Sequence, residues 1–345
     1  MTKQVMVGNI AMGGGAPVSI QSMTNTDTRD AAATLAQIKR LAEAGCEIVR
    51  MSVYDHECAA NVRYFVDSSP VPLVADIHFD YKLAVESVEN GIHKLRINPG
   101  NIGGEANVRI LADCLKAHRI PVRIGVNSGS IEKDILEKYG GVTAQGMLES
   151  ALNHARMLEK CGFDDIVLSM KASNVRLTVE CYRMAAQVCD YPLHVGVTEA
   201  GTAELGRIKS AIGIGALLLD GIGDTIRASI TGDPVQEVRA CLDILRSLGL
   251  RQGVDIVACP ACGRAGIDVE GIAEKVQAAT RAMAGPLRVA VMGCVVNGPG
   301  EAREADIGIF GGRDGGVLFI KGEAPRTVRG DLAEVLIGEI LRRYA

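Results

Sequence analysis

The sequence predicts a (β/α)8 barrel of the TIM type followed by a small α+β domain. Short β-branched runs, each ending in polar residues, recur through the first two thirds of the chain and alternate with segments of helical periodicity. Such alternation is typical of parallel βαβ units. Eight runs can be counted, which matches the strand number of the barrel. The length of 345 residues suits one large domain plus a small one.

The eight predicted strands lie within residues 18–25, 47–53, 73–79, 94–101, 122–130, 166–173, 193–201 and 215–227. Segments 31–45 and 144–162 are typical of the helices between them. An open doubly wound sheet is the alternative, but the first turn, QSMTNTDTRD, carries no G-x-G-x-x-G. The glycines of AMGGGAPVSI lack a following Lys-Ser/Thr and precede a strand, so we expect a hairpin turn covering the lower end of the barrel.

The second domain is predicted to begin where a helix over 238–253 ends. We place the boundary near residue 245, which divides the chain into a barrel, 1–245, and a second domain, 246–345. The latter is predicted to contain a helix over 268–283, a strand over 287–293, a hairpin with GGRDGG as its turn, and a final helix over 332–344.

Composition excludes several classes of partner. The net charge of −4 offers no general attraction to nucleic acid or to an anionic membrane. No apolar stretch approaches the roughly 18 residues of a membrane span, and the N-terminal residues lack the apolar run of a signal peptide. We therefore expect a cytoplasmic protein, in which the ten cysteines do not form a disulfide framework.

Three cysteines stand apart from the others because they lie beside Gly and Pro. Cys259, Cys262 and Cys294 have the spacing C-x2-C-x31-C. A structural zinc needs four ligands, and all six histidines precede residue 195. A thioredoxin-like redox pair would not need Cys294, and three ordinary buried thiols remain a further alternative. An iron–sulfur cluster with three cysteine ligands fits best.

Glu301 is the candidate for a fourth, oxygen ligand. It lies seven residues after Cys294, directly behind Asn-Gly-Pro-Gly. A carboxylate binds iron more weakly than a thiolate does and can be exchanged. We therefore expect Glu301 to be both a ligand and a catalytic group, able to leave and admit a substrate oxygen. A solvated Glu after a turn is the alternative.

Polar residues follow the predicted barrel strands, and barrel active sites form at the carboxyl ends of the strands. In chain order these residues are Arg50, Asp76, His78, Arg96, Asn98, Arg123, Asn127, Lys171, Ser173, His194, Glu199, Asp224, Thr225 and Arg227. Charges within apolar strands are costly unless paired. The five cations outnumber the two carboxylates that could pair with them at the mouth, Asp76 and Glu199, so we expect a phosphate or diphosphate ligand held by bidentate contacts. Together with an iron–sulfur cluster, such a pocket predicts reductive chemistry at a C–O bond.

Six motifs resemble the 4-hydroxy-3-methylbut-2-enyl diphosphate synthase family along nearly the whole chain: QSMTNTDT, LVADIHFDY, RINPGNIG, GIGDTIR, CPACGR and MGCVVNGPGEA. The resemblance implies a 4Fe–4S cluster held by three cysteines and a glutamate, which match Cys259, Cys262, Cys294 and Glu301. It implies reductive ring opening of 2-C-methyl-D-erythritol 2,4-cyclodiphosphate to the linear (E)-4-hydroxy-3-methylbut-2-enyl diphosphate. Electrons would come from reduced flavodoxin or ferredoxin, in the methylerythritol phosphate route to isoprenoids.

The resemblance also implies roles for the barrel residues. Diphosphate-binding residues of the family match Arg50, Arg96, Arg123 and Lys171, and we add Asn98, Asn127 and Arg227 as expected substrate-binding residues. Asp76 and Glu199 match barrel acids, and we expect catalytic roles for them. The resemblance further implies a head-to-tail homodimer of the short, bacterial two-domain type. The alternatives are a metal-stabilised scaffold that only binds a phosphorylated ligand, and a radical SAM barrel, whose C-x3-C-x2-C motif is missing.

Overall fold

The chain folds as two compact units in a computed structural model that describes residues 1–296, 298–312 and 315–344. The units are Met1–Leu248 and Gly249–Ala345. Three positions of predicted turns lie outside the described residues: Asn297 of the Asn-Gly-Pro-Gly segment, and Arg313 and Asp314 of the predicted hairpin turn.

The first unit is the predicted barrel. Its strands are β3 (Ser19–Met23), β4 (Ile48–Ser52), β5 (Leu73–Asp76), β6 (Lys94–Ile97), β7 (Val122–Asn127), β8 (Ile166–Lys171), β9 (His194–Val195) and β10 (Thr225–Ile226). They pair in parallel in the order β8-β7-β6-β5-β4-β3-β10-β9. A parallel bridge between Leu168 and Leu193 joins β8 to the residue before β9, so the ring is nearly closed.

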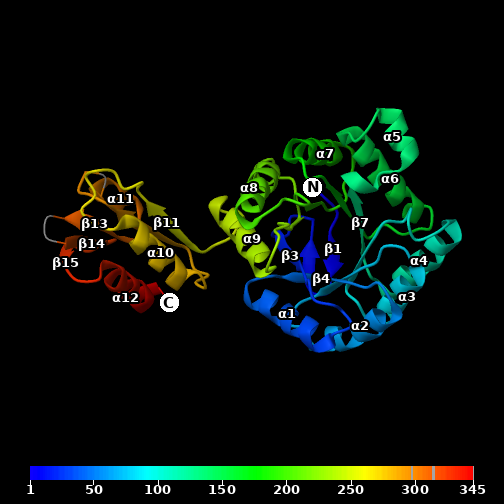
Figure 1. Ribbon diagram of the computed structural model, residues 1–345, viewed down its shortest axis with the longest axis horizontal. Helices are drawn as coiled ribbons and strands as arrows, with labels where there is room; N and C mark the ends of the chain where they lie inside the picture. The colour runs from blue at the N-terminus through cyan, green and yellow to red at the C-terminus, as the bar shows by residue number, and fades with distance from the viewer. Residues whose placement is uncertain (297, 313–314, 345) are drawn as a thin grey trace. The chain divides into compact units, whose positions relative to one another are not determined.

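The α-helices of this unit lie outside the strands (Figure 1). They are α1 (Ala31–Glu43), α2 (His56–Ser68), α3 (Tyr81–Glu89), α4 (Glu105–His118), α5 (Lys133–Tyr139), α6 (Ala144–Glu159), α7 (Val175–Val188), α8 (Ala203–Leu219) and α9 (Val235–Ser247). Several begin at a side-chain cap that follows a strand: Asp30, Asp55 and Asn174 each accept a hydrogen bond from a backbone N–H in the first turn. Local sequence therefore sets where the chain turns back from the barrel mouth.

The predicted strand over 215–227 was largely wrong. Its first residues, through Leu219, belong to α8, and only Thr225–Ile226 are extended. The apolar run at the end of α8 continues this helix, which is unbroken from Ala203 to Leu219 despite the glycines at 213 and 215. Gly221 and Gly223, with φ of 72° and 122°, then turn the chain into the short β10.

A hairpin packs against the amino-terminal ends of the barrel strands, as predicted. Strands β1 (Val5–Val7) and β2 (Ile10–Met12) pair antiparallel. Val5, Val7 and Met12 form an apolar cluster with Ile48, Val74 and Val167, which lie early in β4, β5 and β8. The turn itself falls at Gly8, with φ of 57°, and the glycines of AMGGG follow the hairpin instead of forming its tip.

The second unit is a five-stranded mixed sheet with helices. The elements are β11 (Val254–Ala258), α10 (Val269–Thr280), β12 (Leu287–Met292), α11 (Gly298–Glu304), β13 (Ile307–Gly312), β14 (Gly315–Ile320), β15 (Arg326–Val328) and α12 (Leu332–Tyr344). Strands β11, β12 and β13 are parallel, whereas β14 and β15 add antiparallel. The predicted hairpin and final helix are confirmed; α11 and β15 were not predicted.

Alternation along these strands divides the unit into two apolar layers. Val289 and Val291 pack with residues of α10 and α12 on one face. Ala290 and Met292 pack with Phe310 and other residues on the opposite face. In residues 1–296, 298–312 and 315–344, no helix combines the length and the apolar character that a membrane span requires.

Candidate functional site: a cationic pocket and a cysteine edge

A polar cavity of about 190 Å³ opens inside the barrel. Its lining residues are Arg50, Asp76, His78, Arg96, Arg123, Gly125, Asn127, Ser169, Lys171, Thr198, Arg227 and Ser229. All the predicted substrate-binding residues except Asn98 therefore lie around one space. They converge because alternate residues of each strand point inward and parallel strands place their carboxyl ends at the same edge.

Asp76 holds two of the arginines. Its Oδ1 lies 3.0 Å from Nη1 of Arg96, and its Oδ2 lies 3.7 Å from Nε of Arg50. Burial acts to raise the pKa of Asp76, but Arg50, His78 and Arg96 outweigh it and hold the pKa well below its ordinary value. Asp76 is therefore an ionised counter-charge for both arginines at neutral pH.

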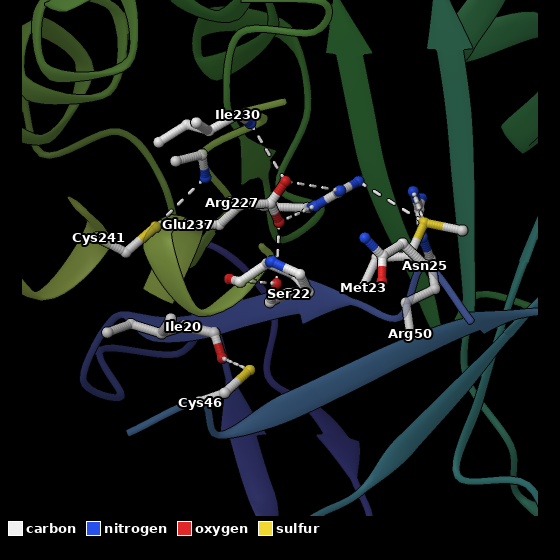
Figure 2. Close-up of polar contacts among 12 residues, drawn as sticks. Ile20, Ser22, Met23, Asn25, Cys46, Arg50, Arg227, Ile230, Glu237 and Cys241 are labelled. Carbon is white, nitrogen blue, oxygen red and sulfur yellow. Dashed lines mark hydrogen bonds and ion pairs between the residues drawn. The ribbon is translucent and has the colours of Figure 1, made fainter. Parts of the chain in front are cut away.

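Glu237 on α9 neutralises a third arginine, and the sequence analysis missed it. Figure 2 shows the Glu237 carboxylate beside Arg227, whose Nε and Nη2 each donate to it at 3.0 Å. The Ser22 hydroxyl donates at 2.9 Å and the Ile230 N–H at 3.2 Å. The sequence contained a feature that could have identified Glu237 as a buried acid: it lies on the apolar face of α9, four residues before the buried Cys241.

We expect Glu237→Ala to lower the free energy of unfolding by about 3–5 kcal/mol, because it leaves the half-buried Arg227 without its counter-charge. Chemical denaturation monitored by circular dichroism measures this. Asp220→Ala is the matched control, because Asp220 pairs with Arg183 at 2.7 Å on the surface, where an ion pair is worth at most about 1 kcal/mol. Equal small losses for both variants would contradict the structural role of Glu237.

Arg123 and Lys171 are the cations left over. Both are buried, at 3% and 6% exposure, and in the described parts of the chain neither belongs to an ion pair. Burial, followed by Arg123 and Arg227, holds the pKa of Lys171 well below its ordinary value. Gly196 makes room for this side chain, because a Cβ there would lie 2.8 Å from the Lys171 Nζ. The pocket thus carries positive groups without counter-charges, which an anion would supply.

Other predicted site residues lie elsewhere. Asn98 is buried and does not line the cavity; its Oδ1 accepts a hydrogen bond from the Gly100 N–H. Glu199 is exposed, has a left-handed backbone with φ of 50°, and forms no ion pair within the described residues. Ser173 is also exposed. Asp224 accepts from the Leu193 N–H, before β9, so it lies at the amino-terminal end of the barrel and not at its mouth.

The cysteine motif lies along one edge of the second sheet. Cys259 follows β11, and its N–H donates to the carbonyl oxygen of Val291 on β12. The Gly293 N–H donates to the Cys259 Sγ at 3.1 Å. Cys294 follows two residues after the end of β12, so it leaves the same edge as Cys259. Cys262 is exposed in the loop after β11, at the turn that the Ala265 N–H closes onto the Cys262 carbonyl oxygen.

Glu301 lies one turn into α11, whose first residue packs near Phe310 at the end of β13. Across residues 1–296, 298–312 and 315–344, no three His, Cys, Asp or Glu side chains lie close enough together to hold a metal ion. The structure therefore brings the predicted sulfur ligands to one edge without closing them into a metal-binding group among the described residues. In donor type they fit an iron–sulfur cluster, and an amide already donates to one of the sulfurs, as is usual around such clusters.

Comparison with known proteins decides the family. The family model described as the GcpE TIM-barrel domain matches residues 2–242, and the GcpE protein C-terminal domain matches residues 255–342. The chain belongs to the GcpE family. GcpE relatives include proteins named 4-hydroxy-3-methylbut-2-en-1-yl diphosphate synthase (flavodoxin). The one from Caldanaerobacter subterraneus subsp. tengcongensis is 56% identical over 342 residues, covering 99% of this chain and 96% of the relative. The one from Geobacter sulfurreducens is 56% identical over 341 residues, covering 98% and 97%.

Solved structures with a similar barrel show the fold of the first GcpE domain alone. The 7,8-dihydropteroate synthase from Vibrio fischeri ES114 has a TM-score of 0.51 at 13% identity, covering 72% of this chain and 98% of that chain. The N-acetylneuraminic acid synthetase from Leptospira borgpetersenii has a TM-score of 0.50 at 15% identity, covering 72% and 91%. Both confirm the barrel predicted from the strand count.

Proposed function

We propose that this GcpE protein is an oxidoreductase that converts 2-C-methyl-D-erythritol 2,4-cyclodiphosphate to (E)-4-hydroxy-3-methylbut-2-enyl diphosphate. The reaction consumes two electrons and two protons; the cyclic diphosphate opens and the C3 oxygen leaves as water. It would serve isoprenoid precursor synthesis by the methylerythritol phosphate pathway. The observation that carries the proposal is the barrel pocket, in which Arg123 and Lys171 have no counter-charge, in a chain 56% identical to proteins named for this product.

The barrel residues bind and orient the diphosphate in this proposal. Arg123 and Lys171 supply the uncompensated positive charge, and Arg50, Arg96 and Arg227 present guanidinium groups already fixed by their carboxylate partners. Fixed guanidinium groups lose little freedom when they bind a phosphate bidentately. The remaining proposed contacts are amides: Asn127, which lines the cavity, and Asn98, which is buried and follows β6.

Asp76 and Glu199 remain the proposed catalytic carboxylates of the barrel, and a different observation supports each. Asp76 lines the cavity, and its ion pairs suit it to hold Arg50 and Arg96 against the substrate while ionised. Glu199 lies outside the cavity lining, but its strained backbone at φ of 50° is a conformation often found at functional sites.

The second unit would hold a 4Fe–4S cluster through Cys259, Cys262, Cys294 and Glu301. When bound, the cluster supplies the two electrons one at a time, received from reduced flavodoxin or ferredoxin. The donor set of three thiols and one carboxylate supports this assignment, as does the hydrogen bond from the Gly293 N–H to the Cys259 Sγ. Because a carboxylate is the most exchangeable member of the set, Glu301 is the ligand proposed to yield to substrate. The absence of disulfides among the ten cysteines suits a reducing cytoplasm.

A head-to-tail homodimer is the proposed assembly. One face of α8 supports it: Leu205, Ile208 and Ile212 are 49%, 50% and 57% exposed and follow helical spacing. An exposed apolar stripe on a helix usually marks an interface.

We expect Ile212→Glu to move the protein from dimer to monomer in sedimentation velocity, because it places a charge within an apolar contact. Lys209→Glu, a charge change on the same helix beside this stripe, is the control and should leave the dimer intact. A wild-type protein that sediments as a monomer would remove the basis for this assembly.

The reaction is tested by anaerobic reconstitution with iron and sulfide, followed by incubation with the cyclodiphosphate and dithionite-reduced viologen. Phosphorus NMR should show the linear diphosphate appearing as the cyclic one disappears. A reducible cluster without conversion of the cyclodiphosphate would reject the substrate and leave the cofactor assignment standing.

A further inference from the structure

Lys94 lies in the barrel interior, below the pocket. It is on β6, two residues before Arg96, so its side chain leaves the strand on the same side and about 6–7 Å deeper. The side chain is 0% exposed. Among the described residues, its Nζ has no hydrogen-bond partner. Lys94 does not line the cavity, so it is not one of the groups that would touch the substrate.

The charged and titratable groups around Lys94 are positive or neutral. Arg123 on β7 and Arg50 on β4 are its charged neighbours. His194 on β9 faces the same interior, is 0% exposed, and has no described partner for either ring nitrogen. Asp76 on β5, the strand paired with β6, is occupied by Arg96 and Arg50.

An ammonium group is unstable in such surroundings. Burial, then Arg123 and Arg50, hold the pKa of Lys94 well below its ordinary value. The same surroundings favour the neutral amine of Lys94 over the ammonium form in the ligand-free protein. An anion against Arg123, the first of the charged neighbours of Lys94, and Lys171 would supply the negative potential that favours the protonated form.

We infer that Lys94 is a buried proton-binding site coupled to anion binding: its amine takes up a proton from solvent when a diphosphate occupies the pocket. The identity of the ligand rests on the proposed function, whereas the coupling rests on the placement of Lys94. The uptake gives the complex one more positive charge than the empty pocket. The affinity for an anion of fixed charge should then fall by up to tenfold per pH unit over the range in which Lys94 titrates.

Titration calorimetry in two buffers of contrasting ionisation enthalpy tests the coupling. The probe is 2-C-methyl-D-erythritol 2,4-cyclodiphosphate, whose two phosphates keep their charge near neutral pH and contribute no protons of their own. We expect Lys94→Met to take up about one proton fewer per bound ligand than the wild type. Lys82→Met, which removes an exposed lysine of α3, should match the wild type.

The outcomes separate this inference from the proposed function. Equal proton uptake by the wild type and Lys94→Met would overturn the coupling. Failure of the cyclodiphosphate to bind would count against the proposed substrate. The two proteins would then be compared with inorganic pyrophosphate as the probe. Protons that pyrophosphate itself gains or loses are the same for both proteins, so the difference in proton uptake still reports on Lys94.

Stability in the absence of ligand gives a second test. The unfolded chain binds the Lys94 proton up to a pKa of about 10.4, and the folded chain loses it at a lower pH. Between these values the unfolded state binds more protons, so this residue makes stability rise with pH. We expect Lys94→Met to be more stable than the wild type at neutral pH, with the difference shrinking toward pH 10. A difference independent of pH would mean that Lys94 is already charged, and the inference would fail.

Discussion

Lys171→Met is expected to lower kcat/KM by about 10²–10³-fold, because it removes a buried cation proposed to hold the diphosphate. Loss of a desolvated charge contact of this kind costs about 2–5 kcal/mol. The folded protein should not suffer: Lys171 has no carboxylate partner among the described residues, and methionine fills a similar volume without a charge to bury. Steady-state kinetics and a thermal melt measure the two quantities.

The opposite directions of the two readouts make this test specific. A residue with only a structural role would lose activity and stability together, whereas Lys171→Met should lose activity with an unchanged or higher melting temperature. Lys39→Met, which removes an exposed lysine of α1, is the control and should change neither. Retention of wild-type kcat/KM by Lys171→Met would exclude this lysine from the anion site.

Cys262→Ser is expected to abolish the cluster and lower activity by more than about 10²-fold. Mutation of a residue that only supports a metal ligand lowers metal affinity or activity by about 10–100-fold, and here a proposed ligand itself would be lost. Cys262 is exposed, so serine there disturbs no packing and any effect reports on ligation. Iron content and visible absorption after anaerobic reconstitution measure the cluster, and the viologen-coupled assay measures activity.

Cys161→Ser is the matched control for that experiment. Cys161 is half-buried in the first unit, after α6. The Cys161→Ser variant should have the iron content and activity of the wild type. If Cys262→Ser kept both the visible absorption and the activity, the assignment of this residue as a cluster ligand would be wrong.

Most of the architecture could be read from the sequence because it depends on local patterns. The β-branched runs alternate with amphipathic segments, and caps such as Asp30 and Asp55 start the helices where the pattern changes. The pattern fails where it is ambiguous. The apolar residues before Leu219 suit a buried strand or a helix equally, and packing in the barrel made them part of α8.

The cationic character of the pocket was also predictable, since the arginines and the lysine lie in predicted strands or directly after one, and a parallel barrel brings these strands together around one interior. The sequence did not predict which of these cations lack a counter-charge. Asp76 pairs with Arg50 and Arg96, and Glu237 reaches Arg227 from a helix ten residues further along the chain. Only these pairings reveal Arg123 and Lys171 as the groups that an anion would satisfy.

By itself, the sequence determined the barrel, the second α+β unit, the set of cations at the mouth and the three-cysteine motif. These follow from periodicity and from residue type at strand ends. The tertiary structure alone decided the ion pairs of the pocket, the exposure of Glu199 and the burial of Lys94 beneath the site. The physical reason is that charge pairing and desolvation depend on distances between residues far apart in the chain, and no local pattern encodes those distances.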